Sequence, residues 1–257
     1  MIIDISQHNT IKNWDQVKNA VDGVIMRMGY TGYSSGAKVY DKKFMNNMEA
    51  VKIRDIPYGV YYFPASINKA EAEAEADFIA ETIKSLSLRP TLGVWLDSEI
   101  ADVKTKKGRA DNLSREKRTE FLHIIIGRLH DRGIDCGVYA STDWLYHNLN
   151  MEMLPGVPVW VAQYNKAQVC TYKGDYIMHQ YTSKGAIMGI SGNVDLNRLH
   201  ILDAPVYVPE PVKDKTLDDA ISVIAHKVIE GEFGDGHDQR KERIYKLIRQ
   251  RVNDILK

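Results

Sequence analysis

Two carboxylates at the end of an apolar segment are the residues of this sequence best suited to chemistry. Residues 92–99 read LGVWLDSE, and alternate side chains of a strand share a face, so Trp95, Asp97 and Glu99 point the same way. Two neighbouring carboxyl groups beside an indole ring acquire different pKa values, which leaves one protonated acid next to one carboxylate. Glycoside hydrolysis uses such a pair. A strand end that enters a solvated acidic loop would show the same short pattern, so the pair needs support from the rest of the chain.

Two further carboxylates support the pair because they also lie at the ends of apolar segments. Asp4 lies in residues 1–5, MIIDI, and Asp195 lies in residues 190–197, ISGNVDLN. Enzymes with a β/α barrel keep their chemistry at the carboxyl ends of the strands, so all four side chains are predicted to converge on one rim. Taken singly, each of these residues is also compatible with a loop cap.

The elements that must position these carboxylates follow from short apolar runs alternating with amphipathic stretches up to about residue 200. Strands are predicted at residues 1–5, 23–28, 58–64, 91–97, 135–140, 157–163, 176–181 and 193–196. Helices are predicted at residues 14–21, 42–53, 69–86, 115–132 and 142–149. No helical spacer follows residue 157. The predicted fold class is therefore α/β, a truncated (β/α) barrel with about five β/α units followed by loop-connected strands.

A proline-containing segment divides the chain. Residues 203–216 hold Pro205, Pro209 and Pro211 among polar residues, which is typical of a semi-rigid linker. We expect a catalytic domain at residues 1–202 and a small helical bundle at residues 217–257, where aliphatic residues recur at helical spacing. A module of that size is near the lower limit for an independent fold.

Composition argues against several classes of partner and cofactor. Lysine plus arginine equals aspartate plus glutamate, 34 against 34, so no net charge favours nucleic acid. No apolar run approaches the roughly 18 residues of a membrane span, and no export signal is visible at the start. Cys136 and Cys170 are predicted to be buried free thiols. None of the eight histidines lies in a metal-binding motif, so neither a metal nor another cofactor is predicted.

Taken together, these residues resemble the glycoside hydrolase family 25 lysozymes. The similarity covers almost the whole predicted first domain: residues 4–6 (DIS), Trp14, 58–63 (YGVYYF), 95–99 (WLDSE), 160–164 (WVAQY), 179–181 (HQY) and 191–195 (SGNVD). It implies a barrel of the truncated type that hydrolyses the β-1,4 bond between N-acetylmuramic acid and N-acetylglucosamine in peptidoglycan.

The resemblance also implies roles for the four carboxylates. Glu99 would be the general acid, and Asp97 would orient the acetamido group of the substrate or stabilise the charge that forms as that group attacks. Asp4 and Asp195 would hold and tune the pair. Retaining, inverting and acetamido-assisted routes all stay open at this point.

Aromatic residues at predicted strand ends are candidates for stacking on sugar rings. They are Tyr30, Tyr62, Tyr139, Trp160 and Tyr181. Core packing is the commoner role for any one of them. The resemblance favours Tyr62 and Trp160 as subsite walls, because both lie inside matching motifs. The loop at residues 102–112 carries three lysines and Arg109, which either meet an anionic polymer or form a solvated loop.

The tail resembles the short cell-wall-binding repeat of some phage lysozymes. The matching residues are 224–225, 228–231, 233–236, 240–243 and 252–256. Phe233 stands where a tryptophan is usual, and a tyrosine-containing segment between the last helices is shortened. We expect this module to bind the wall or to self-associate.

Two other functions were weighed against a muramidase. A chitinase-like glycosidase would carry a run of acidic residues before Glu99, and this chain lacks one. A protein that only adheres to the wall would not need all four carboxylates. The sequence therefore predicts an endolysin-type lysozyme that is made without a signal peptide, acts on the cell wall and is released by a holin if it comes from a phage.

Overall fold

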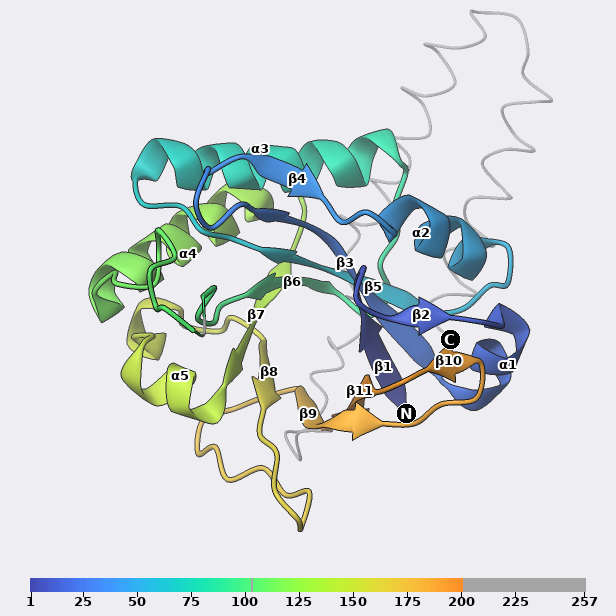
Figure 1. The fold of residues 1–257 in the computed structure, drawn as a ribbon. Coiled ribbons are helices and arrows are strands. Elements are labelled where there is room, and N and C mark those ends of the chain that lie inside the picture. Colours follow the sequence, from blue (N-terminus) through green and yellow to red (C-terminus); the bar gives the residue numbers. More distant parts are fainter. Residues whose placement is uncertain (103, 201–257) are drawn as a thin grey trace, which may run out of the picture. The chain divides into compact units, whose positions relative to one another are not determined.

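A barrel of eight strands forms the centre of the protein (Figure 1). The computed structural model describes residues 1–102 and 104–200, so the predicted linker and helical module lie outside the described residues. The barrel strands are β1 (Ile2–Ile5), β3 (Gly23–Thr31), β5 (Tyr58–Phe63), β6 (Val94–Asp97), β7 (Cys136–Ser141), β8 (Val159–Ala162), β9 (Met178–Gly185) and β11 (Val194–Leu199). Their order is β1-β11-β9-β8-β7-β6-β5-β3, and parallel pairing of β1 with β3 closes the ring. The predicted α/β barrel is confirmed.

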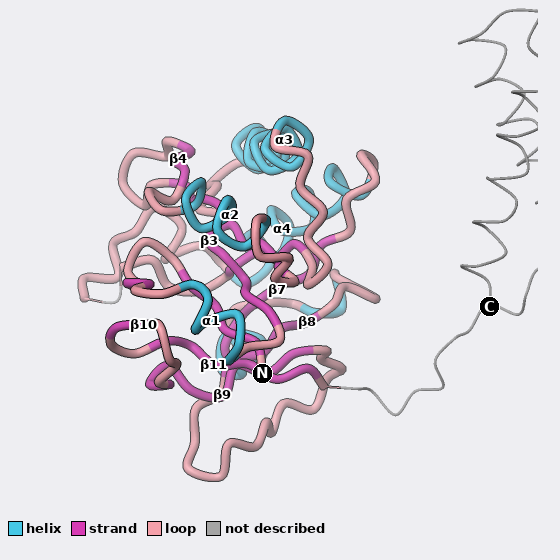
Figure 2. The backbone as a smooth tube through the Cα atoms, turned by 90° about the vertical axis from the view of Figure 1, so that its right-hand side faces the viewer, coloured by secondary structure: helices cyan, strands magenta, loops and turns pink. Residues whose placement is uncertain are grey.

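The helices belong to the first half of the barrel, as the missing helical spacers predicted. They are α1 (Trp14–Ala20), α2 (Phe44–Lys52), α3 (Lys69–Ser85), α4 (Arg115–His130) and α5 (Thr142–His147), with a short 3-10 helix at Met151–Met153. Asn13, Ser114 and Ser141 cap α1, α4 and α5 by accepting hydrogen bonds from backbone N–H groups of the first turn. Figure 2 shows α2, α3 and α4 on one side of the barrel, away from β9 and β11. None of the described helices is long and apolar enough to cross a membrane.

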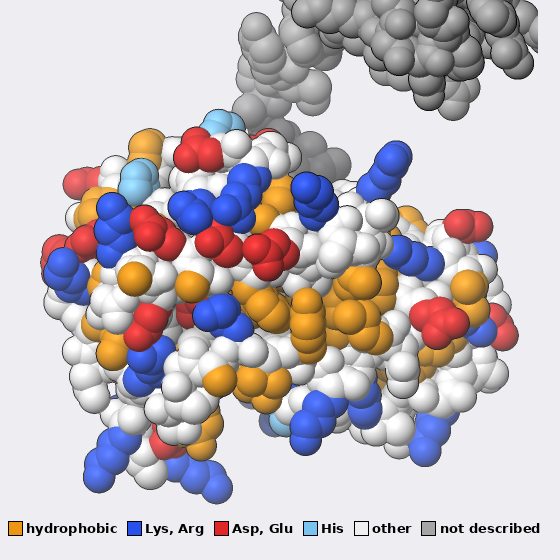
Figure 3. Space-filling model, turned by 90° about the horizontal axis from the view of Figure 1, so that it is seen from above, with side chains coloured by type: hydrophobic (Ala, Val, Ile, Leu, Met, Phe, Trp, Pro, Cys, Tyr) orange, Lys and Arg blue, Asp and Glu red, His pale blue; other side chains and the backbone are white. Residues whose placement is uncertain are grey.

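Three short strands were not predicted. β4 (Lys38–Tyr40) pairs antiparallel with the end of β3, and β2 (Thr10–Ile11) pairs with β10 (Ile190–Ser191). Val39 and Tyr40 of β4, with Met45 of α2, are exposed hydrophobic residues. The strand β4 and the helix α3 lie on the face at the top of Figure 1. Figure 3 shows hydrophobic side chains gathered in the middle of that face, beside acidic and basic side chains in alternation. Charges of both signs are mixed there, so this face has no strong field of one sign.

The two faces of the barrel strands build two separate cores. Aliphatic residues on the outer face pack against the helices, whereas Trp95, Trp160 and Met178 fill the interior with the partly buried rings of Tyr61 and Tyr139. The Trp160 ring lies 5.6 Å from that of Trp95 and 4.5 Å from that of Tyr139, in edge-to-face arrangements that aromatic pairs prefer. This plug of rings forms the floor beneath the rim.

Both cysteines are free thiols. Cys136 is buried, as expected, whereas Cys170 is only partly buried, which corrects the expectation of two buried thiols.

Candidate active site

All four predicted carboxylates meet at one end of the barrel. Asp4 lies in β1, Asp97 ends β6, and Glu99 follows two residues later. Asp195 reaches the same rim from the amino end of β11, because β11 runs antiparallel to β1 and pairs Asp195 with Asp4. The negative charges of Asp4 and Glu99 act on Asp97, and that of Asp195 acts on Glu99, so the four carboxyl groups form one interacting cluster.

Asp4 is the most firmly held member of the cluster. Its side chain is 5% exposed, and its Oδ2 atom accepts hydrogen bonds of 2.8 Å from Gln180 Nε2 and Asn197 Nδ2. Burial, with the charge of Asp195 adding to it, raises the pKa of Asp4 to about 8. Burial also raises the pKa of Asp195 above its ordinary value, and the neighbouring carboxyl group of Asp4 offsets part of that rise.

The Asp97 and Glu99 pair differs in access to solvent. Asp97 is 7% exposed, and burial raises its pKa well above the usual range, with the charges of Glu99 and Asp4 adding to the effect. Its Oδ1 atom has no hydrogen-bond partner among the described residues. Removal of water, followed by the charge of Asp195, raises the pKa of Glu99 to about 7. Glu99 keeps an exposed surface, so water screens part of this repulsion.

Two amide side chains connect the aromatic floor to Asp4. Tyr139 donates a 2.7 Å hydrogen bond to Gln180 Oε1, and Trp160 Nε1 donates a 2.8 Å bond to Asn197 Oδ1. Each amide oxygen is thus occupied by an aromatic donor, which turns the amide nitrogen toward Asp4. Gln180 and Asn197 face each other across β9 and β11. Neither residue is among those predicted from the sequence, although Gln180 lies in the motif at residues 179–181 and Asn197 ends the motif at residues 190–197, each at an inward position.

The structure does not bring Tyr62 to the rim. Tyr62 is fully buried on the outer face of β5, where its ring lies 5.6 Å from that of Phe78 and its hydroxyl bonds with Thr31 Oγ1. Its neighbour Tyr61 points into the barrel instead and lies 6.4 Å from Trp160. Trp160 is only 1% exposed, so it lies beneath the carboxylates rather than beside an open subsite.

The other three aromatic candidates lie in different places. Tyr30 lines a hollow of about 300 Å³ beside Gln7, His8 and Arg27. Tyr139 acts on the carboxylates through Gln180, whose Oε1 atom also accepts a hydrogen bond from Tyr164, a residue that the sequence reasoning did not select. Tyr181 lies on the opposite face of β9 from Gln180, donates to Met1 Sδ and carries Arg198 over its ring, so it is remote from the cluster.

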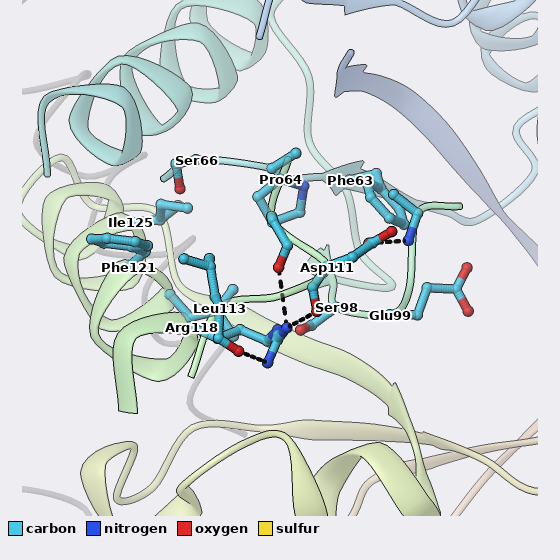
Figure 4. A pocket seen from close by; sticks show the side chains of 14 residues that line it. Phe63, Pro64, Ser66, Ser98, Glu99, Asp111, Leu113, Arg118, Phe121 and Ile125 are labelled. Carbon is cyan, nitrogen blue, oxygen red and sulfur yellow. Dashed lines mark hydrogen bonds between the residues drawn. The ribbon is translucent and has the colours of Figure 1, made fainter. Parts of the chain in front are cut away.

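The segment that follows Glu99 is held in place by two residues further along the chain, Asp111 and Arg118. The carboxylate of Asp111 accepts hydrogen bonds from the backbone N–H groups of Ala101, Asp102 and Gly108. Arg118 is buried, donates to the carbonyl groups of Ala110 and Asp111, and lies over the ring of Trp144. Figure 4 shows the Glu99 carboxyl group turned away from Arg118. The acid therefore faces the open side of the rim while its loop is anchored on the other.

The Trp144 ring supports the strand end that carries the carboxylate pair. Its Nε1 atom donates a 3.1 Å hydrogen bond to the hydroxyl of Ser98, the residue between Asp97 and Glu99. In the part of the chain that the structure describes, no group of three or more histidine, cysteine, aspartate or glutamate side chains is arranged to hold a metal ion. What the cluster can do chemically is give and take protons near neutral pH.

Paired carboxyl groups at the mouth of a β/α barrel are an arrangement typical of glycoside hydrolases. More narrowly, the chain belongs to the glycosyl hydrolases family 25, whose model matches residues 3–190. The family resemblance noted in the sequence is thus confirmed.

Several lysozymes and autolysins are similar to the chain. It is 26% identical over 180 residues to the autolytic lysozyme of Clostridium acetobutylicum, covering 70% of this chain and 50% of that protein. It is 26% identical over 204 residues to lysozyme M1 of Streptomyces globisporus, covering 77% and 67%. The chain thus spans about half the length of the autolytic lysozyme.

Solved structures show the same fold. The modular autolysin LytC from Streptococcus pneumoniae, in complex with a synthetic peptidoglycan ligand, superposes with a TM-score of 0.66 at 27% identity, over 77% of this chain and 46% of that one. The bacterial lysozyme from Streptomyces coelicolor gives a TM-score of 0.63 at 23% identity, over 79% and 92%. This second similarity concerns the fold alone.

Proposed function

We propose that the protein is a muramidase, which hydrolyses the β-1,4 bond between N-acetylmuramic acid and N-acetylglucosamine in bacterial peptidoglycan. One observation carries the proposal: Glu99 is an exposed carboxyl group whose pKa is raised to about 7, at the open side of a rim of carboxylates. An acid that keeps its proton near neutral pH is what the leaving oxygen of a glycosidic bond requires. The lysozyme names of the relatives support the same substrate.

In this mechanism Glu99 acts first as an acid and then as a base. Its proton passes to the glycosidic oxygen as the bond from that oxygen to C1 breaks, and the sugar ring takes up positive charge. The resulting carboxylate then accepts a proton from the water that attacks C1, which returns Glu99 to its starting state. The exposed surface of Glu99 gives it access to a polymer that lies across the rim.

Asp97 acts on the sugar rather than on the leaving group. Its Oδ1 atom has no hydrogen-bond partner within residues 1–102 and 104–200, and a buried polar atom is stabilised when it gains one, so the acetamido N–H of the sugar is a suitable donor. That hydrogen bond would turn the acetamido carbonyl oxygen toward C1 and favour an acetamido-assisted route. Asp4 and Asp195 both have raised pKa values, so they keep the negative charge around Asp97 and Glu99 low.

Product analysis tests the proposal. Purified peptidoglycan is digested with the wild type, with Glu99→Gln and with Glu81→Gln, which changes an exposed glutamate of α3. Reduced fragments are then identified by mass spectrometry. We expect new muramic-acid reducing ends from the wild type and from Glu81→Gln, but none from Glu99→Gln. Glucosamine ends would make the protein a glucosaminidase, and no new ends on several wall types would leave a wall-binding protein.

We infer further that the protein acts at the cell wall and that residues 217–257 bind it there. Relatives named autolysin and endolysin support the place of action. The tail itself lies outside the described residues, so its support is the sequence resemblance alone.

A further inference from the structure

Arg109 lies in the loop that follows Glu99. Its side chain forms hydrogen bonds within the protein and does not point freely into solvent, where a polymer would bind. Its guanidinium group donates two parallel hydrogen bonds to the carboxylate of Glu71, of 2.8 and 2.9 Å, and a third of 3.3 Å to the carbonyl of Ala65. Its backbone N–H donates a 2.8 Å bond to the carbonyl of Tyr33. The side chains of Arg109 and Glu71 are 16% and 33% exposed, so the pair is partly shielded from solvent.

These contacts join three consecutive segments of the rim. Tyr33 lies in the turn after β3, Ala65 lies after β5, and Arg109 itself lies after β6. The turn after β3 folds directly onto the guanidinium group: Gly36 has a φ of +71°, and a Cβ atom there would come within 2.6 Å of Arg109 Nη1. One residue thus ties together loops that are more than 30 residues apart in the sequence: the backbone N–H of Arg109 bonds to residue 33, and its guanidinium group packs against residue 36 and bonds to residue 65.

The joined segments are the ones that flank Glu99. Ala65, Ala101 and Ala110 line the hollow that includes Glu99, and Tyr33 and Ala101 line the neighbouring hollow beside Arg27. Phe63, at the end of β5, lines both. A shift of any of these loops would therefore move the Glu99 carboxyl group relative to the residues that line the two hollows, where a glycan strand must lie.

We propose that Arg109 is a positioning residue, which fixes Glu99 by clamping the loops after β3, β5 and β6 through its contacts with Tyr33, Ala65 and Glu71. The inference rests on the proposed muramidase function for its catalytic consequence. The clamp needs the planar fork of arginine, because one lysine ammonium cannot bond both carboxylate oxygens and the carbonyl in the same geometry. Of the four basic residues in this loop, only the three lysines remain exposed to a polymer.

The test compares this clamp with a matched ion pair elsewhere. Arg128 of α4 also makes a two-bond contact with a carboxylate of α3, that of Asp77, and the two side chains are 38% and 32% exposed. The variants are Arg109→Ala, Arg109→Lys, Gly36→Ala, the exchange Arg109→Glu with Glu71→Arg, and the control Arg128→Ala. Each is assayed for kcat and KM on peptidoglycan, for melting temperature, and for amide hydrogen exchange.

We expect Arg109→Ala and Gly36→Ala to lower kcat about tenfold or more, since a misplacement of about 1 Å can cost a hundredfold, with a smaller change in KM. Arg109→Lys should recover little, whereas the charge exchange should recover part of kcat. The control should lose melting temperature by a similar amount while kcat stays at the wild-type value. A kcat for Arg109→Ala equal to that of Arg128→Ala would overturn the proposal.

Hydrogen exchange separates this proposal from the function on which it rests. We expect Arg109→Ala to speed exchange in residues 32–37, 64–68 and 104–113 together, and Arg128→Ala to leave all three unchanged. If the wild type releases no muramic-acid ends, the muramidase function fails, and the exchange result alone then decides the clamp. Unchanged exchange in the three segments would disprove it in either case.

Discussion

At the scale of the residue, the site depends on carboxyl groups that are held out of water without a cation. Asp4 and Asp97 are buried, and neither takes part in an ion pair within the described residues. Burial of an unpaired charge is unfavourable, so these groups keep protons instead. Burying these carboxyl groups lowers the stability of the fold, but it keeps protons close to the substrate. Such a conflict between stability and activity is common in active sites.

Replacement of Asp4 by asparagine should make the protein more stable near pH 8. The pKa of Asp4 is about 8 in the fold against an ordinary 3.8, so its stabilising effect is complete below about pH 4 and is lost as the pH rises through 8. Asparagine has no proton to lose and can still accept from Gln180 and Asn197. We expect Asp4→Asn to raise the free energy of unfolding at pH 8 by about 5 kcal/mol, because each pKa unit between 3.8 and 8 is worth about 1.4 kcal/mol, with little change at pH 4. Urea titrations at both pH values measure this, and equal pH dependence in the two proteins would contradict it.

The pH dependence of the rate should reveal the pKa of the general acid, Glu99. Glu99 must be protonated to act, and its pKa is raised to about 7, so kcat/KM should fall as the pH rises through about 7. A tenfold loss per pH unit is expected on that limb. The profile is measured on soluble glycan fragments, because the charge of an intact wall changes over the same range. A rate that stays level to pH 9 would remove Glu99 from the role of acid.

At the scale of the element, the periodicity of the sequence predicts the strands and helices of the barrel, but not its shortest strands or the direction of every side chain. Eight predicted strands and five predicted helices form close to their expected bounds, because each combines a long apolar pattern with a cap or a turn. The short strands β2, β4 and β10 have only two or three residues, too few to show a period. Likewise, both faces of a barrel strand are buried, so the motif at residues 58–63 does not reveal which of its tyrosines, Tyr61 or Tyr62, points inward.

The roles of the inner and outer faces of the barrel strands can be distinguished by removing one hydrogen-bond donor from each face. Trp160→Phe keeps a large ring in the interior but leaves Asn197 Oδ1 without its donor, so the amide is free to turn away from Asp4. Tyr62→Phe removes the outward hydroxyl that bonds with Thr31. Each variant should lose about 1–3 kcal/mol of stability. Only Trp160→Phe should lower kcat, by roughly tenfold if the turned amide costs Asp4 about 1.4 kcal/mol of hydrogen bonding. Equal kcat values for the two variants would show that the link through Asn197 has no catalytic part.

At the scale of the whole molecule, charge gives little guidance toward a partner. The 34 basic and 34 acidic residues cancel, and charges of both signs mix on the face in Figure 3. Attraction to an acidic polymer must therefore be local. Lys104, Lys106 and Lys107 are exposed, follow Glu99 closely in the sequence and form one such local group. No pattern in the sequence indicated that Arg109, in the same loop, would be bound by Glu71, because that contact depends on how three distant loops fold together.

The linker predicted at residues 203–216 and the wall binding proposed for residues 217–257 together predict that catalysis and wall attachment can be separated. The family match and the closed barrel both lie before this segment. A chain ending at residue 202 should therefore hydrolyse soluble glycan fragments with an unchanged kcat/KM. On insoluble peptidoglycan it should bind about tenfold or more weaker, because the second point of attachment is lost. Co-sedimentation with purified walls measures the binding, and light scattering of both chains measures association. Equal sedimentation together with a change from dimer to monomer would make residues 217–257 a self-association module instead.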